Sequence, residues 1–157
     1  MEEKYRSYLA LMDALREGLA RLTELANQKT AAVRQDNLMA LDEVLKQEQA
    51  QALAFRGLEQ KREKLHEELG MGDRPLSGVP AAFPEKLRLE ARQTVEALQS
   101  QYKIYNNSAR VARNTLEVNL HEIEKILSYM GSAPADGAGY AGREAEPPSA
   151  MKTDFRA

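Results

Sequence analysis

The sequence contains no cysteine and no tryptophan, and it has no long apolar run. Without cysteine the chain cannot form disulfides or thiolate metal sites. No stretch approaches the roughly 18 consecutive apolar residues of a membrane-spanning helix. The first ten residues, MEEKYRSYLA, lack the basic start and the apolar run of a signal peptide. We therefore expect a cytoplasmic protein that does not insert into a membrane.

The chain also lacks an excess of charge of either sign. It has 22 Lys and Arg residues against 24 Asp and Glu residues, and the two signs are interspersed. A nearly neutral balance gives no electrostatic footprint for nucleic acid, so we expect none as a partner. Leu, Ala, Glu, Gln, Lys and Arg dominate the remaining composition, which is typical of long helices.

Proline is absent from most of the chain, and its positions predict where helices end. All six prolines lie within 75–84 or 134–148. Because a proline inside a helix costs about 3 kcal/mol, residues 1–74 and 85–133 can be helical throughout. The segment GMGDRPLSGVPAAFP predicts a loop at 70–83, and Pro84 suits the first turn of a helix at 84–130. Residues 131–157, rich in Gly, Ala, Ser and Pro, predict a flexible tail.

The segment before the loop predicts two helices rather than one. Apolar residues recur at steps of three and four from Leu9 to Leu25, weaken across 27–37, and resume at Leu38. Asp36 is the predicted N-cap of the second helix. A single helix over 3–69 would be about 100 Å long, against about 70 Å for 84–130. We therefore expect an all-α fold for residues 1–130, in which long helices at 3–34, 37–69 and 84–130 form an antiparallel coiled-coil-like bundle.

The helix at 84–130 carries two apolar rows. The first is a continuous seam, which predicts coiled-coil packing and consists of Leu87, Ala91, Leu98, Tyr102, Tyr105, Ala109, Ala112, Leu116, Leu120, Ile123, Leu127 and Met130. The second lies on the opposite side and consists of Ile104, Val111, Val118 and Tyr129, with Ile126 close by. The second row is either a surface for a partner or a face that one of the first two helices covers.

Catalytic and metal-binding patterns are missing. His66 ends a Glu-x-x-His motif, but a helical di-iron site needs that motif twice, and His121 has Val118 in place of the glutamate. The charged neighbours of His66 predict a solvated surface position. We therefore expect no enzyme activity, no metal and no cofactor. Glu48 and Arg62 interrupt the apolar positions of the second helix, which predicts that they set its register or extend to water at its edge.

Four asparagines gather in the third helix, although asparagine is a poor helix former. They are Asn106, Asn107, Asn114 and Asn119. Such a cluster indicates side-chain hydrogen bonding, either to the backbone ends of the bundle, which we favour, or to an extended partner.

Together these features resemble the FlgN family of flagellar export chaperones. The resemblance covers roughly residues 5–142 and is carried by LDEVLKQEQAQALAFRGLEQKREKL (41–65), YNNSARVARNTLEVNLHEIEKIL (105–127) and GAGYAGRE (137–144). Arg62 matches an arginine that often follows the Leu/Glu-rich run of helix 2, and Asn106 or Asn107 matches an asparagine before the final amphipathic stretch. Tyr140 with Gly142 matches the tyrosine and glycine of the tail, although Ala141 interrupts the usual pair.

The resemblance implies a chaperone that binds the C-terminal helical segment of hook-filament junction proteins, prevents their premature assembly and delivers them to the export gate. It also implies that Tyr140 docks on the cytoplasmic domain of that gate. Recognition of a client helix in a groove needs apolar anchors at helical spacing. The candidates are Val111, Leu116, Val118, Leu120, Ile123, Ile126 and Leu127. The alternative is a self-associating coiled-coil scaffold or tether, in which the second row makes a homodimer.

Overall fold

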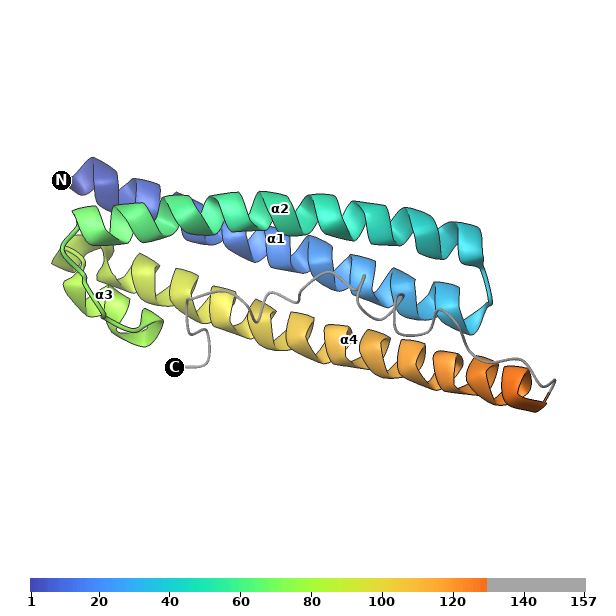
Figure 1. The fold of residues 1–157 in the computed structure, drawn as a ribbon. Coiled ribbons are helices and arrows are strands. Elements are labelled where there is room, and N and C mark those ends of the chain that lie inside the picture. Colours follow the sequence, from blue (N-terminus) through green and yellow to red (C-terminus); the bar gives the residue numbers. More distant parts are fainter. Residues whose placement is uncertain (130–157) are drawn as a thin grey trace.

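The structure, a computed structural model, describes residues 1–129, and every element in that range is helical. The long helices are α1 (Glu2–Arg34), α2 (Leu38–Glu68) and α4 (Arg88–Tyr129). Successive long helices run in opposite directions, as Figure 1 shows, which confirms the all-α fold and the three long helices. None of the described helices is long and apolar enough to cross a bilayer.

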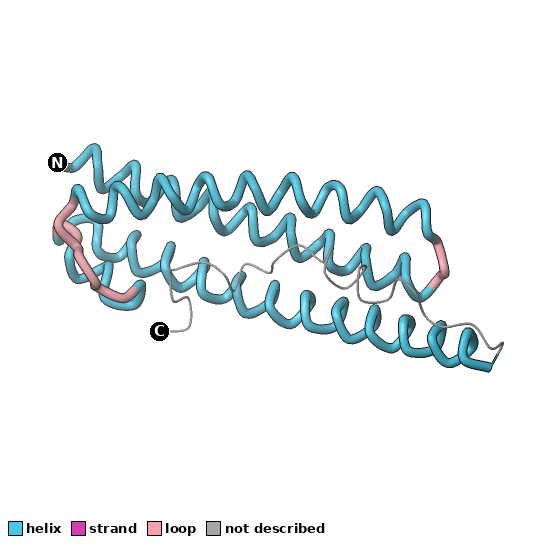
Figure 2. Tube along the Cα trace, viewed as in Figure 1, coloured by secondary structure: helices cyan, strands magenta, loops and turns pink. Residues whose placement is uncertain are grey.

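Helix α1 is the central element of the bundle. It packs along its length against both α2 and α4, whereas α2 and α4 approach each other at few points. Its buried residues accordingly occupy a broad face that runs from Tyr8 to Val33. In Figure 2 the short α1–α2 turn and the longer α2–α4 connection lie at opposite ends of the long helices.

Two apolar clusters of unequal size form the core. The larger lies toward the end that holds the α2–α4 connection and includes the fully buried rings of Tyr8, Phe55 and Phe83. The smaller lies near the α1–α2 turn and consists of Ala32, Val33, Leu41 and Leu116. The predicted seam of α4 is buried from Leu87 to Leu116, apart from the half-buried Ala109.

The α1–α2 turn corrects the predicted N-cap. Asn37, not Asp36, caps α2, because its Oδ1 accepts a hydrogen bond from the Ala40 N–H at 3.1 Å. Asp36 instead adopts a left-handed backbone conformation with φ of 53°. The Asn37 N–H then donates to the Ala32 carbonyl at 2.9 Å, which closes the end of α1. Asp and Asn are the non-glycine residues that tolerate this conformation best, so either could have taken either place.

The connection at 70–83 is more structured than the predicted loop. Leu76–Gly78 forms the 3₁₀ turn η1, Val79–Ala82 forms α3, and Glu85–Leu87 forms the 3₁₀ turn η2 ahead of α4. Gly70 and Gly72 have positive φ angles and turn the chain after α2. The apolar residues of the segment then pack into the larger cluster: Met71, Leu76, Val79 and Phe83 are all buried. The third helix therefore begins as a 3₁₀ turn after Pro84 and becomes α-helical at Arg88.

Glu48 and Arg62, which interrupt the apolar positions of α2, are both buried in ion pairs. Lys29 Nζ lies 3.1 and 3.0 Å from the two carboxylate oxygens of Glu48, and both side chains are 9% exposed. Arg62 donates to both carboxylate oxygens of Glu59 at 3.0 and 2.8 Å. The interpretation of Glu48 and Arg62 as edge residues reaching water is therefore wrong, whereas a role in register stays a prediction.

Candidate functional site

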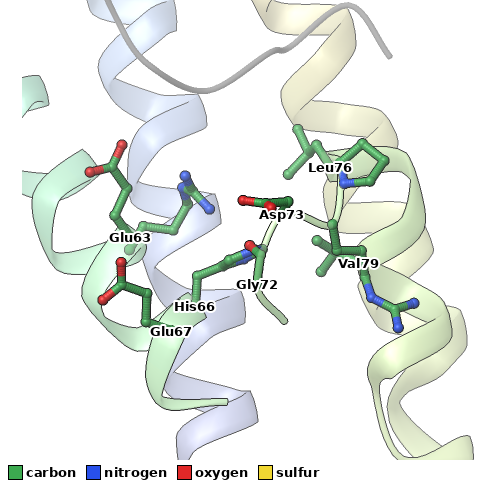
Figure 3. A pocket seen from close by; sticks show the side chains of 10 residues that line it. Glu63, His66, Glu67, Gly72, Asp73, Leu76 and Val79 are labelled. Atoms are coloured by element: carbon green, nitrogen blue, oxygen red, sulfur yellow. The ribbon is translucent and has the colours of Figure 1, made fainter. Parts of the chain in front are cut away.

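A polar network at the loop end of the bundle involves His66, which the sequence placed on a solvated surface. The structure corrects this, because His66 is half-buried and both of its ring nitrogens have partners. Nδ1 lies 3.0 Å from the Tyr8 hydroxyl, and Nε2 lies 3.0 Å from the Gly72 carbonyl. Arg62 donates to the Tyr8 oxygen at 2.8 Å. In Figure 3 the His66 ring reaches across to Gly72, with Glu63 and Glu67 on the side away from Leu76 and Val79.

Charge and burial fix the protons of this network. Burial, and then the nearby charge of Arg62, lower the pKa of His66, so the ring is neutral at pH 7. Burial raises the pKa of Tyr8, so its hydroxyl keeps its proton and donates to Nδ1. The Nε2–H of His66 then donates to Gly72. The adjoining hollow of about 480 Å³ thus contains a histidine whose two nitrogens are already engaged, and the network ties α1, α2 and the connection together.

The opposite end of the molecule exposes apolar surface, and this surface is our candidate site. Leu116 is the last buried residue of α4, because it packs on Ala32 and Val33 of α1 and on Leu41 of α2. Residues 117–129 continue α4 for about 20 Å without a buried residue. In Figure 1 this last part of α4 extends past the α1–α2 turn.

The seven predicted anchor residues fall into three groups. Leu116 belongs to the core and cannot present a free surface, which corrects its candidacy. Leu120, Ile123 and Leu127 continue the inner seam after Leu116; Ile123 is 46% exposed and the other two are half-buried. Val111, Val118 and Ile126 lie on the outer row and are 38%, 60% and 59% exposed.

Within the described residues the outer row is not covered by α1 or α2, so the covered-face reading is wrong, whereas a partner surface stays a prediction. Ile104 and Tyr129 are exposed as well. We call Ile104, Val111, Val118, Ile126 and Tyr129 the outer stripe. Beyond Leu116, α4 is therefore apolar on two opposite sides, and a helix of that kind is normally buried.

A hollow lies beside the outer stripe, and sequence reasoning did not find it. It has a volume of about 450 Å³ and separates the end of α1 from α4. Its lining consists of Val33, Arg34 and Asp36 on one side and Asn114, Thr115, Val118, Asn119 and Glu122 on α4. The one available signal was length, because a helix at 84–130 is longer than either partner and must leave an end without cover.

Within residues 1–129 the asparagines of α4 do not bond the backbone ends of the bundle, contrary to our expectation. Among the residues that the structure describes, the four make one side-chain hydrogen bond, in which Arg110 Nη2 donates to Asn107 Oδ1 at 2.7 Å. Asn114 and Asn119 face the hollow. Tyr140, the predicted gate-docking residue, and Met130 lie outside the described residues.

Comparison with known proteins supplies a family. A family model described as FlgN protein matches residues 1–147, which is most of the chain. The searches of curated proteins and of solved structures gave no match.

Proposed function

The chain belongs to the FlgN family, a family of flagellar export chaperones, and from this premise we propose that it holds the C-terminal helical segment of hook-filament junction proteins on the distal end of α4. The bound client is kept from premature assembly in the cytoplasm and is delivered to the export gate. Membership in a chaperone family gives the general role, and a flagellar protein is the partner that this role requires. The site and the identity of the client are the parts that we add.

The single observation that carries the proposal is the exposed apolar end of α4. Val118 and Ile126 are each about three-fifths exposed, and Ile123 is nearly half exposed. An amphipathic client helix that covers Val118 and Ile126 would bury apolar surface on both molecules, at about 25 cal/mol for each Å². The hollow beside Val118 gives such a helix a place to lie against α1 as well as α4.

The test is the affinity of the chaperone for a peptide with the C-terminal helical sequence of a junction protein from the same organism. Full burial of a Val or Ile side chain contributes about 1.5–3 kcal/mol, so Val118→Asp and Ile126→Asp should each weaken binding about tenfold or more. Leu53→Asp is the matched control, because Leu53 is 69% exposed and belongs to α2, which packs on α1 rather than on α4. Far-UV circular dichroism should show unchanged helicity for all three variants.

The proposal fails if the two α4 variants bind the peptide as tightly as the parent protein does. The alternative scaffold makes a different prediction, which light scattering over a range of concentrations tests. A tight homodimer that Val118→Asp dissociates, together with indifference to junction-protein peptides, would favour self-association through the outer stripe.

We place the second contact, to the cytoplasmic domain of the export gate, at Tyr140, as the family resemblance implies. A single aromatic in a Gly- and Ala-rich segment can supply most of the contact area of a short recognition element. Tyr140→Ala should weaken binding to the gate domain and leave the affinity for the junction-protein peptide unchanged. Loss of both interactions together would contradict the separation of the two sites.

A further inference from the structure

The outer stripe contains amide side chains as well as apolar ones. Asn107 follows Ile104 by three residues, and Asn114 follows Val111 by three, so both asparagines lie on the face of the stripe. The pattern repeats after seven residues, which is about two helical turns. Apolar and amide groups therefore alternate along an exposed face, in the arrangement of the two core positions of a coiled-coil heptad.

Nothing within the described bundle explains these amides. Asparagine is a poor helix former, and both residues are exposed in the middle of α4. The Asn107 oxygen accepts a hydrogen bond from Arg110, which leaves its amide NH₂ group as a donor. Asn114 has no side-chain hydrogen bond within residues 1–129 and faces the hollow next to Val118.

We propose that Asn107 and Asn114 determine specificity, by selecting a client helix that carries Asn or Gln between its apolar anchors and by fixing its register on α4. This inference rests on the proposed function and extends the client site from the distal end of α4 along the outer stripe to Ile104. The occupant is an amphipathic helix with apolar residues seven apart and amide side chains at the interleaved positions. An amide that is covered by an apolar side chain loses its water without gaining a partner, whereas an amide opposite another amide is satisfied. A helix shifted by one turn brings apolar groups over Asn107 and Asn114 and is rejected for that reason.

The experiment is a thermodynamic cycle with two chaperones and two synthetic helical peptides. The peptides share length, charge and apolar heptad positions, and they differ in having Asn or Leu at the interleaved positions. The chaperones are the full chain and its Asn107→Leu/Asn114→Leu variant. Because the cycle compares ratios, differences in the helicity or self-association of the peptides cancel.

The full chain should prefer the Asn peptide, relative to the double variant, by about tenfold or more in the ratio of dissociation constants. The double variant should bind the Leu peptide more tightly than the full chain does. Asn106→Leu is the matched control: Asn106 is also exposed on α4 but lies about 100° away from Asn107, and its ratio should equal that of the full chain.

Two results would overturn the inference and are distinguishable. If Val118→Asp abolishes binding of both peptides while the ratio is the same for the full chain and the double variant, the stripe is the site but the asparagines do not select the client. If Val118→Asp changes the binding of neither peptide, the stripe is not the site, and the proposed function falls together with this inference.

Discussion

Removal of the ammonium group of Lys29 should destabilise the bundle strongly, because it leaves a carboxylate in the interior. Lys29 Nζ contacts both oxygens of Glu48, and the two side chains are each 9% exposed. Deleting one partner of a buried ion pair typically costs about 3–5 kcal/mol. Since domains of this kind are stable by about 5–15 kcal/mol, Lys29→Met should remove a large part of the total.

The assay is urea unfolding followed by far-UV circular dichroism at pH 7. With an m-value of about 2 kcal/mol per M, a loss of about 4 kcal/mol lowers the unfolding midpoint by about 2 M. The variant Lys29→Met/Glu48→Met should recover most of that loss or exceed the parent protein, because well-packed apolar residues often replace a buried pair at no cost. Such a recovery would show that Lys29→Met destabilises the protein through the uncompensated charge of Glu48 rather than through a packing defect.

Lys46→Met is the control. It removes an ion pair of the same residue class with Asp42 on α2, but both side chains are more than two-thirds exposed, so the midpoint should barely change. The reasoning is refuted if Lys29→Met costs less than about 1 kcal/mol, because the Lys29–Glu48 pair would then behave as a solvent-screened surface pair. It is also refuted if the double variant is no more stable than Lys29→Met.

Three further predictions concern stability. The pKa of His66 is lowered in the folded chain, so below its ordinary pKa of 6.5 the unfolded chain binds more protons and the urea unfolding midpoint should fall as the pH drops from 7.5 to 5. His66→Gln should flatten this pH dependence, whereas His121→Gln, at an exposed position, should not. Asn37→Ala should lower the free energy of unfolding in urea by about 1 kcal/mol, because it removes the cap of α2. Asn37→Ser should retain most of the stability that the cap provides, and an equal loss in both variants would contradict the capping role. Gly57→Ala should raise the melting temperature by the equivalent of about 0.5–1 kcal/mol, because nothing lies within 4 Å of the added Cβ. Gly18→Ala should stabilise the protein less or destabilise it, since its Cβ would lie 3.1 Å from the buried Phe55 ring, and equal stabilisation by both variants would contradict this reasoning.

The sequence predicted the extents of the helices well because they depend on local chemistry. Proline excludes helix interiors wherever it stands, so the proline-free stretches nearly coincide with the long helices. The break between α1 and α2 was also predicted within a few residues. The predicted N-cap was wrong by one position. Asp36 and Asn37 are both suited to cap a helix or to adopt the left-handed conformation, and only the path of the chain decides which residue does which.

The features that the sequence did not predict depend on residues far apart in the chain. His66 has charged neighbours along α2, but its partner Tyr8 is on α1 and its second partner is beyond α2 at Gly72. The connection contains many helix breakers, yet Phe83 is buried because its ring packs against those of Tyr5 and Tyr8, with ring centroids 4.8 and 6.0 Å apart. The sequence showed the outer stripe as a row of apolar residues. Whether another helix covers that row depends on how the three long helices pack together.

The uneven core makes the distal end of α4 a suitable place for these binding tests. Aromatic side chains and the His66 network stabilise the loop end, whereas the small cluster at the α1–α2 turn contributes four modest side chains. No residue after Leu116 in the described part of α4 is buried, so a charge at Val118 or Ile126 removes no core contact. Such substitutions should leave the free energy of unfolding nearly unchanged. A loss of client affinity in these variants can therefore be attributed to the surface itself rather than to unfolding of the bundle.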